Sequence, residues 1–127
     1  MRPSRIQAVE DVHREAAREL TEPLRWFYSE VGCLDGVSGS GDGLQLCFKS
    51  ARIYLRIRLV KSPRVDPTGF PLILAVPSLL EAVERLEERG FGVERFHGID
   101  WADRRIATHD PAGNRVALKR DWPFGML

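Results

Sequence analysis

A tight turn near the carboxyl end of the chain, Asp110-Pro-Ala-Gly113, constrains the fold more than any other segment. Aspartate suits the first position of a β-turn, proline presets φ at the second, and glycine is favoured at the fourth. The flanking segments 104–109 and 114–119 alternate between apolar and polar residues, as half-buried strands do. The sequence therefore predicts a β-hairpin that closes the fold.

The hairpin completes a pattern that begins with a short apolar strand over residues 72–76. A helix follows, opened by a capping box of Ser78 and Glu81 and ended by Gly90. Residues 91–96 predict a further strand. The second half of the chain thus has the order strand, helix and three strands.

The first half repeats this order with weaker patterns. Residues 5–13 predict a strand, and a helix follows that Thr21 caps and Gly32 ends. Residues 36–43 predict a flexible loop or a strand edge, and residues 44–60 alternate and predict two half-buried strands, which makes about three strands after the helix. A linker with proline and glycine, residues 62–69, separates the halves. The doubled order predicts an α+β fold made of two similar modules.

Composition limits the classes of protein that this chain can belong to. Its 127 residues, 43% of them hydrophobic and 29% charged, predict one soluble domain. A formal net charge of +1 gives no indication of a nucleic-acid partner. No apolar run is long enough to cross a bilayer, and none follows the basic N-terminus, so we expect no membrane partner, no signal peptide and a cytoplasmic location. The two cysteines, Cys33 and Cys47, are expected to be free thiols.

Three segments together resemble the vicinal oxygen chelate superfamily, which includes glyoxalase I, the bleomycin and fosfomycin resistance proteins and the extradiol dioxygenases. The first joins residues 9–13 to the helix end Leu24-Arg-Trp-Phe-Tyr-Ser-Glu-Val-Gly32. The second is the strand and helix of residues 72–90, and the third is the hairpin segment of residues 104–115. The order and spacing of the three segments match the fold of the family better than any one of its activities.

The resemblance implies one domain over residues 1–127, with βαβββ modules at about 5–62 and 70–120. The curved mixed sheets of the two modules would form a cavity between them. Short members of this superfamily usually dimerise, so the resemblance also implies a homodimer.

In metal-dependent members of the superfamily, four ligands come from fixed strand positions. In this chain the matching positions hold Asp11, Tyr54 or Arg56, Pro71 and Ala117. Proline and alanine have no side-chain donor atom, and arginine is a poor ligand for a divalent cation. The resemblance therefore implies a member with no metal and no other cofactor. The alternative is a divalent metal at a displaced site, held by Asp11 and His13, which share a strand face.

Alternation along the strands and the resemblance together select candidate ligand-binding residues. They are His13, Tyr54, Arg56, Arg58, Trp101 and Arg115. Because guanidinium groups suit carboxylates and phosphates, we expect a small polar, anionic or aromatic ligand. Each residue also has a possible role other than ligand binding. Arginines on strands often lie at surfaces or subunit contacts, and tryptophan often packs in a core.

Two classes of function follow from these residues. The missing ligands at Pro71 and Ala117 favour a metal-free binding protein, similar to the bleomycin resistance proteins. The alternative is an enzyme of glyoxalase or dioxygenase type: a lyase, isomerase or oxidoreductase. It would use a displaced metal, or metal-free acid–base chemistry by His13 and Tyr54. The sequence leaves open whether the chain is an enzyme.

Overall fold

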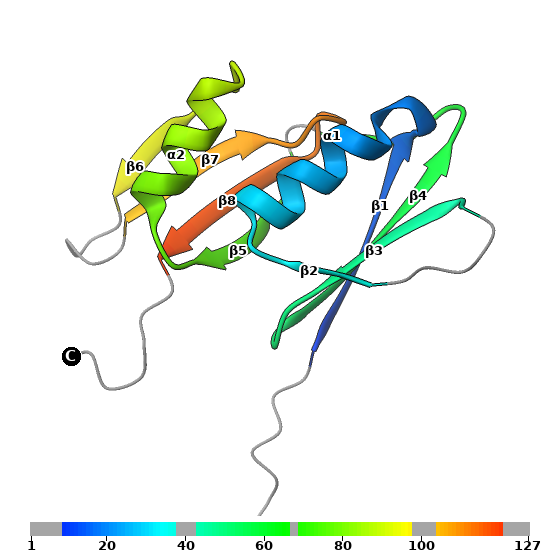
Figure 1. Cartoon of the computed structure of the whole chain (residues 1–127), viewed down its shortest axis with the longest axis horizontal. Helices are drawn as coiled ribbons and strands as arrows, with labels where there is room; N and C mark the ends of the chain where they lie inside the picture. The colour runs from blue at the N-terminus through cyan, green and yellow to red at the C-terminus, as the bar shows by residue number, and fades with distance from the viewer. Residues whose placement is uncertain (1–8, 38–42, 67–68, 98–103, 121–127) are drawn as a thin grey trace, which may run out of the picture.

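The computed structural model describes residues 9–37, 43–66, 69–97 and 104–120, which form two mixed four-stranded sheets and their helices (Figure 1). The strand order is β1-β4-β3-β2 in the first sheet and β5-β8-β7-β6 in the second. In each sheet the first pair is parallel and the other pairs are antiparallel. The predicted α+β fold of two βαβββ modules is confirmed.

The elements of the first module lie between residues 10 and 60. They are β1 (Glu10–Ala17), η1 (Arg18–Leu20), α1 (Thr21–Trp26), η2 (Phe27–Val31), β2 (Asp35–Val37), β3 (Gln45–Lys49) and β4 (Ile53–Val60). The second module is β5 (Leu72–Val76), α2 (Leu79–Glu88), β6 (Glu94–His97), β7 (Arg104–His109) and β8 (Arg115–Arg120). No helix among the described residues is long and apolar enough to span a membrane.

One continuous apolar cluster contains buried side chains of both modules. The helix formed by α1 and η2 joins them, because Phe27 packs on Phe91 of the second module with ring centroids 5.8 Å apart. Tyr28, the next residue, packs on Phe48 of the first sheet at 5.5 Å. Phe91 is therefore part of the core, and β6 begins only at Glu94, later than the sequence predicts.

The hairpin turn has the geometry that its residues predict. The amide of Gly113 donates to the carbonyl oxygen of Asp110 at 2.9 Å, and Gly113 has a φ of 96°, which favours glycine. The Asp110 carboxylate accepts further hydrogen bonds from the amides of Ala112 and Asn114, both at 2.9 Å. Ser78 likewise caps α2 as predicted, accepting from the amide of Glu81 at 3.1 Å.

Two predictions for the first module are wrong in detail. The first strand extends to Ala17 and does not end at residue 13, because it pairs along all of β4, and the predicted residues 5–8 lie outside the described residues. Thr21 does not cap the helix: its hydroxyl donates to the carbonyl of Arg18 at 2.7 Å, since the turn η1 leads directly into α1.

The first helix also ends differently from the prediction. Gly32 keeps a right-handed conformation, and Cys33 takes the left-handed one, with a φ of 58°. The amide of Leu34 then donates to the carbonyl of Tyr28 at 2.9 Å, which closes the helix. A Cβ at Gly32 would lie 3.0 Å from both Leu74 and the Tyr28 carbonyl oxygen. Position 32 thus needs glycine because a side chain would not fit there, and not because the backbone is left-handed.

Cys33→Gly is expected to raise the free energy of unfolding by about 0.5–1 kcal/mol, because it relieves the cost of a left-handed residue with a Cβ. Urea unfolding followed by circular dichroism measures the change. Gly32→Ala is the matched comparison and is expected to destabilise the fold. Equal effects of the two substitutions would show that the handedness at position 33 carries no strain.

Candidate functional site

The face of the first sheet opposite its apolar core is polar. Along β4, Ile53, Leu55 and Ile57 are buried, and Tyr54, Arg56 and Arg58 alternate with them on the other face. The parallel register of β1 places acidic or histidine side chains beside each of these three. The pairs are Asp11 with Tyr54, His13 with Arg56, and Glu15 with Arg58.

These side chains contact one another along the sheet. The Asp11 carboxylate lies 3.5 Å from Nε2 of His13 and 3.4 Å from Nε of Arg56. The guanidinium of Arg56 also lies over the Tyr54 ring, 4.7 Å from its centroid. The buried Nε of Arg56 nevertheless makes no hydrogen bond to the described residues. This face therefore holds a cation whose hydrogen-bonding capacity is not filled from within the described chain.

Tyr54 has a second neighbour on this face, Cys47 of β3. A side-chain hydrogen bond to Cys47 is the main cause that raises the pKa of the Tyr54 hydroxyl above its ordinary value. Like an ordinary tyrosine, Tyr54 is protonated at neutral pH and can donate a hydrogen bond, and the raised pKa makes its hydroxyl harder to ionise. Both described cysteines are free, as predicted, Cys33 exposed and Cys47 buried.

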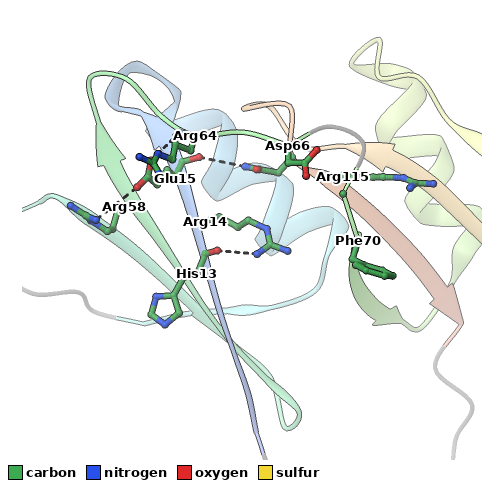
Figure 2. A pocket seen from close by; sticks show the side chains of 10 residues that line it. His13, Arg14, Glu15, Arg58, Arg64, Asp66, Phe70 and Arg115 are labelled. Carbon is green, nitrogen blue, oxygen red and sulfur yellow. Dashed lines mark hydrogen bonds and ion pairs between the residues drawn. The ribbon is translucent and has the colours of Figure 1, made fainter.

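A pocket of about 490 Å³ opens where the carboxyl ends of β1 and β4 meet the linker and the start of β8 (Figure 2). Four arginines line it: Arg14, Arg58, Arg64 and Arg115. His13, Asn114, Gly69 and Phe70 and the carboxylates of Glu15 and Asp66 complete the lining. The pocket thus draws its walls from both modules.

Charge is unbalanced in this pocket, because four arginines and two acidic residues line it. Glu15 is already engaged: its Oε1 accepts from the backbone amide of Arg64 at 2.9 Å, and its Oε2 lies 3.8 Å from Arg58. In Figure 2, Arg14 extends from β1 toward the side where Phe70 and Arg115 lie. The arrangement favours an anion, since arginine binds carboxylate and phosphate oxygens through paired donors.

The structure brings three of the six predicted ligand-binding residues into this pocket: His13, Arg58 and Arg115. Tyr54 and Arg56 lie on the same sheet face but do not line the pocket. Trp101 lies outside the described residues.

Sequence reasoning missed the linker side chains and Arg14. Strand alternation assigns Arg14 to the apolar face together with Val12 and Ala16. It reaches the pocket because β1 is an edge strand, where a long side chain can extend beyond the sheet. Arg64, Asp66 and Phe70 belong to no periodic element, so no local pattern could place them.

The positions that match metal ligands in the superfamily that the sequence resembles carry a poor set of metal donors. Asp11, His13 and Pro71 do line one hollow of about 280 Å³ between β1 and β5. The guanidinium of Arg56 approaches Asp11, however, and Ala117 is a buried methyl group in the second sheet. Among the described residues, no three histidine, cysteine or acidic side chains are grouped to hold a metal ion. This donor set does not fit a divalent cation, which needs about three protein ligands.

No protein-family model matches the chain, and no curated protein matches it. Several solved structures do match the chain. A Bacillus anthracis protein assigned to the glyoxalase family is 22% identical with a TM-score of 0.71, and the match covers 95% of this chain and 100% of that one. TnmS3, an antibiotic binding protein from Streptomyces sp. CB03234, is 22% identical with a TM-score of 0.62, over 94% and 100% of the chains. Lactoylglutathione lyase from Agrobacterium tumefaciens is 21% identical with a TM-score of 0.63, over 97% and 99%.

Proposed function

We propose that this chain, which has the vicinal oxygen chelate fold, binds a small organic anion in the pocket between its two modules. The observation that carries the proposal is the excess of arginine over carboxylate in a pocket of about 490 Å³, a volume within the usual range for small-molecule sites. The exposed ring of Phe70 gives this pocket one apolar wall, which suits an aromatic or apolar group next to the anion.

Binding without a metal ion is part of this proposal. The donors at the matching positions do not suit a divalent cation, and the arginines supply the positive charge that a metal would otherwise provide. TnmS3, whose fold this chain shares, is an antibiotic binding protein, which supports a role in binding a small molecule. We also propose a cytoplasmic location.

Calorimetric titration with phenyl phosphate tests the proposal, with benzyl alcohol as the neutral comparison. We expect one equivalent of phenyl phosphate to bind, more weakly as salt concentration rises, and benzyl alcohol to bind much more weakly or not at all. Equal binding of the two compounds, or no binding of phenyl phosphate and benzoate at millimolar concentration, would contradict it.

The requirement for metal is tested separately, by elemental analysis and by melting temperature with added Ni²⁺, Co²⁺, Zn²⁺, Mn²⁺ and Fe²⁺. A true metal site would raise the melting temperature with increasing metal concentration. We expect no such rise. A stoichiometric metal with a concentration-dependent rise would favour the alternative function, an enzyme of glyoxalase or dioxygenase type with Asp11 and His13 as ligands.

One observation favours this enzymatic alternative even without a metal. Asp11 lies 3.5 Å from His13, so the carboxylate can orient the imidazole as an acid–base group. Tyr54 is not a second base, because its raised pKa keeps the hydroxyl protonated, and the same shift makes it a weaker proton donor. The alternative therefore depends on His13 as the only base of the predicted pair.

We further propose that the protein is a homodimer in which a second copy closes the pocket. Phe70 is 97% exposed, and Ile73 on the neighbouring edge strand β5 is also exposed. Exposed apolar side chains at an unpaired sheet edge commonly mark an interface. A second copy packed here would cover both.

Phe70→Ser is expected to raise the dissociation constant of this dimer at least tenfold, because burial of a phenylalanine contributes about 1.5–3 kcal/mol. Sedimentation equilibrium measures the constant. Leu80→Ser, at an exposed leucine on α2, is the matched control and is expected to leave it unchanged. A protein that is monomeric at all concentrations would refute the dimer and the closing of the pocket, while the arginines that line the pocket remain those of one chain.

A further inference from the structure

The pocket of about 490 Å³ between the modules, which we call the arginine pocket, carries more positive charge than its own acidic residues balance. Its charged lining consists of Arg14, Arg58, Arg64, Arg115, Glu15 and Asp66. The linker residues at this pocket that the structure does not describe, Pro67 and Thr68, have uncharged side chains. With four guanidinium groups and two carboxylates, and apart from His13, the lining has a formal charge of +2.

Most of these arginines have no acidic partner. The Oε2 atom of Glu15 lies 3.8 Å from Arg58, which is the ion pair already described. The guanidinium of Arg14 donates to the backbone carbonyl oxygen of the preceding residue at 2.9 Å, a contact that leaves its charge unbalanced. Within the described part of the chain, no carboxylate forms an ion pair with Arg14, Arg64 or Arg115. Three guanidinium groups of the lining are therefore available to a ligand.

The cations lie on two sides of the pocket. Figure 2 shows Arg58 and Arg64 on one side, and Arg115 on the side where Phe70 lies. Arg14 extends from β1 toward that second side. Like charges around one pocket repel one another, and the repulsion is stronger where the protein displaces water. A ligand with two negative charges balances the formal charge of this lining, whereas a ligand with one leaves part of the repulsion in place.

We propose that the ligand of the arginine pocket is an organic dianion, a small molecule that carries two negative charges next to an aromatic or apolar group. The apolar group lies on Phe70, whose ring is exposed at the pocket. Phosphate monoesters and dicarboxylates both have this charge, and arginine binds the oxygens of both through paired donors. The inference rests on the proposed function, because it specifies the charge of the ligand that the same pocket binds.

Calorimetric titration with two pairs of compounds that differ by one negative charge tests the proposal. Phenyl phosphate and phenyl sulfate are similar in shape, but at about pH 8 the phosphate ester, whose second pKa is about 6, carries nearly two charges and the sulfate ester one. Phenylmalonate and phenylacetate carry two carboxylates and one. We expect each dianion to bind about tenfold more tightly than its monoanion, because the second charge is attracted by the same lining. The pair with the larger ratio distinguishes a phosphate monoester from a dicarboxylate.

Three variants test whether this preference comes from the lining. Arg115→Gln removes one guanidinium group, and the ratio of phenyl phosphate affinity to phenyl sulfate affinity is expected to fall from about tenfold to about threefold. Asp66→Asn removes one negative charge with little change in shape, and the ratio is expected to rise to about thirtyfold. Arg52→Gln, at an exposed position outside the pocket, is the matched control and is expected to leave the ratio unchanged. Urea unfolding confirms that each variant remains folded.

Equal affinities of dianion and monoanion in both pairs would overturn the proposal and leave a site for anions of any charge. A ratio that neither Arg115→Gln nor Asp66→Asn changes would also overturn it, because the preference would then arise elsewhere on the chain. Absence of binding by all four compounds would refute both this inference and the proposed function. Failure of the dianion preference alone is therefore distinct from failure of the anion site.

Discussion

Replacing Asp110 with alanine is expected to lower the free energy of unfolding by about 4 kcal/mol, a large part of the stability of a domain this size. The side chain is buried in the hairpin turn and accepts three hydrogen bonds shorter than 3 Å. Two come from backbone amides of the turn, and the third comes from the Tyr28 hydroxyl at 2.6 Å. Alanine leaves all three donors without their partner.

The Tyr28 contact joins the helix of the first module to the hairpin of the second, across 82 residues of sequence. Tyr28 is fully buried, so without Asp110 its hydroxyl has no water to bond to. An orphaned buried donor costs about 1–3 kcal/mol. The loss in Asp110→Ala is therefore expected to exceed the loss in Tyr28→Phe, which is about 1.5–2 kcal/mol and leaves the two amide bonds intact.

Urea unfolding of the two single variants and the double variant measures these values as a cycle. The double variant is expected to be at least as stable as Asp110→Ala, because Tyr28→Phe removes the buried hydroxyl that Asp110→Ala leaves without a partner. Asp110→Asn keeps an acceptor for the turn amides and is expected to fall between the other two. Additive losses in the cycle would show that the bond across the modules contributes nothing.

The same contact predicts how alkali affects the protein. Burial, and then the charge of Asp110, raise the pKa of Tyr28 well above the ordinary value of 10.0. In the unfolded chain the hydroxyl ionises near pH 10, while in the folded protein it stays protonated. Its contribution to stability is thus complete below pH 10 and is lost as pH rises above it. The difference in stability between the wild type and Tyr28→Phe is expected to shrink over that range.

The second large effect concerns binding. Removing two guanidinium groups, with Arg58→Gln and Arg115→Gln together, is expected to weaken phenyl phosphate binding about a hundredfold. A charge-assisted hydrogen bond contributes about 1.5–3 kcal/mol, and the 65% exposure of the Arg58 side chain reduces this toward tenfold for each arginine. Loss of Arg58 also leaves the carboxylate of Glu15 without its ion-pair partner, so its negative charge is less balanced.

The matched control is Arg25→Gln with Arg52→Gln, which changes the net charge equally at exposed positions outside the pocket. This variant is expected to weaken binding less than threefold, through the long-range field alone. Calorimetry at two salt concentrations measures both variants. A similar loss in both would mean that phenyl phosphate responds to net charge and does not occupy the pocket.

Strand periodicity made much of the fold predictable. The β5 strand, the Ser78 cap of α2 and the hairpin turn are each determined by residues within about ten positions of one another. The alternation of β4 also predicted which face carries Tyr54, Arg56 and Arg58. The end of the first helix was predicted less well: Gly32 packs closely against Leu74, which is distant in sequence, and Cys33 takes the left-handed conformation.

In the candidate site, too, local sequence patterns predicted some residues, and contacts between distant residues determined the others. Sequence patterns selected Arg58 and Arg115, since each lies on a strand with a clear alternation, and the family resemblance selected His13 on a strand without one. They could not select Arg64, Asp66 or Phe70, which the linker brings to the pocket, or Arg14, which lies on the opposite strand face. A non-periodic segment has no preferred face until the two modules pack around it.

By itself, the sequence determined the order of the elements, the turn at Asp110 and the polar face of the first sheet, because these depend on local spacing and backbone preference. The tertiary structure alone decided that Asp110 also accepts from Tyr28, and that arginines from β1, β4, the linker and β8 surround one pocket. Those contacts join residues far apart in sequence. They form only when the packing of the two modules buries enough apolar surface to offset the entropy of bringing these residues together.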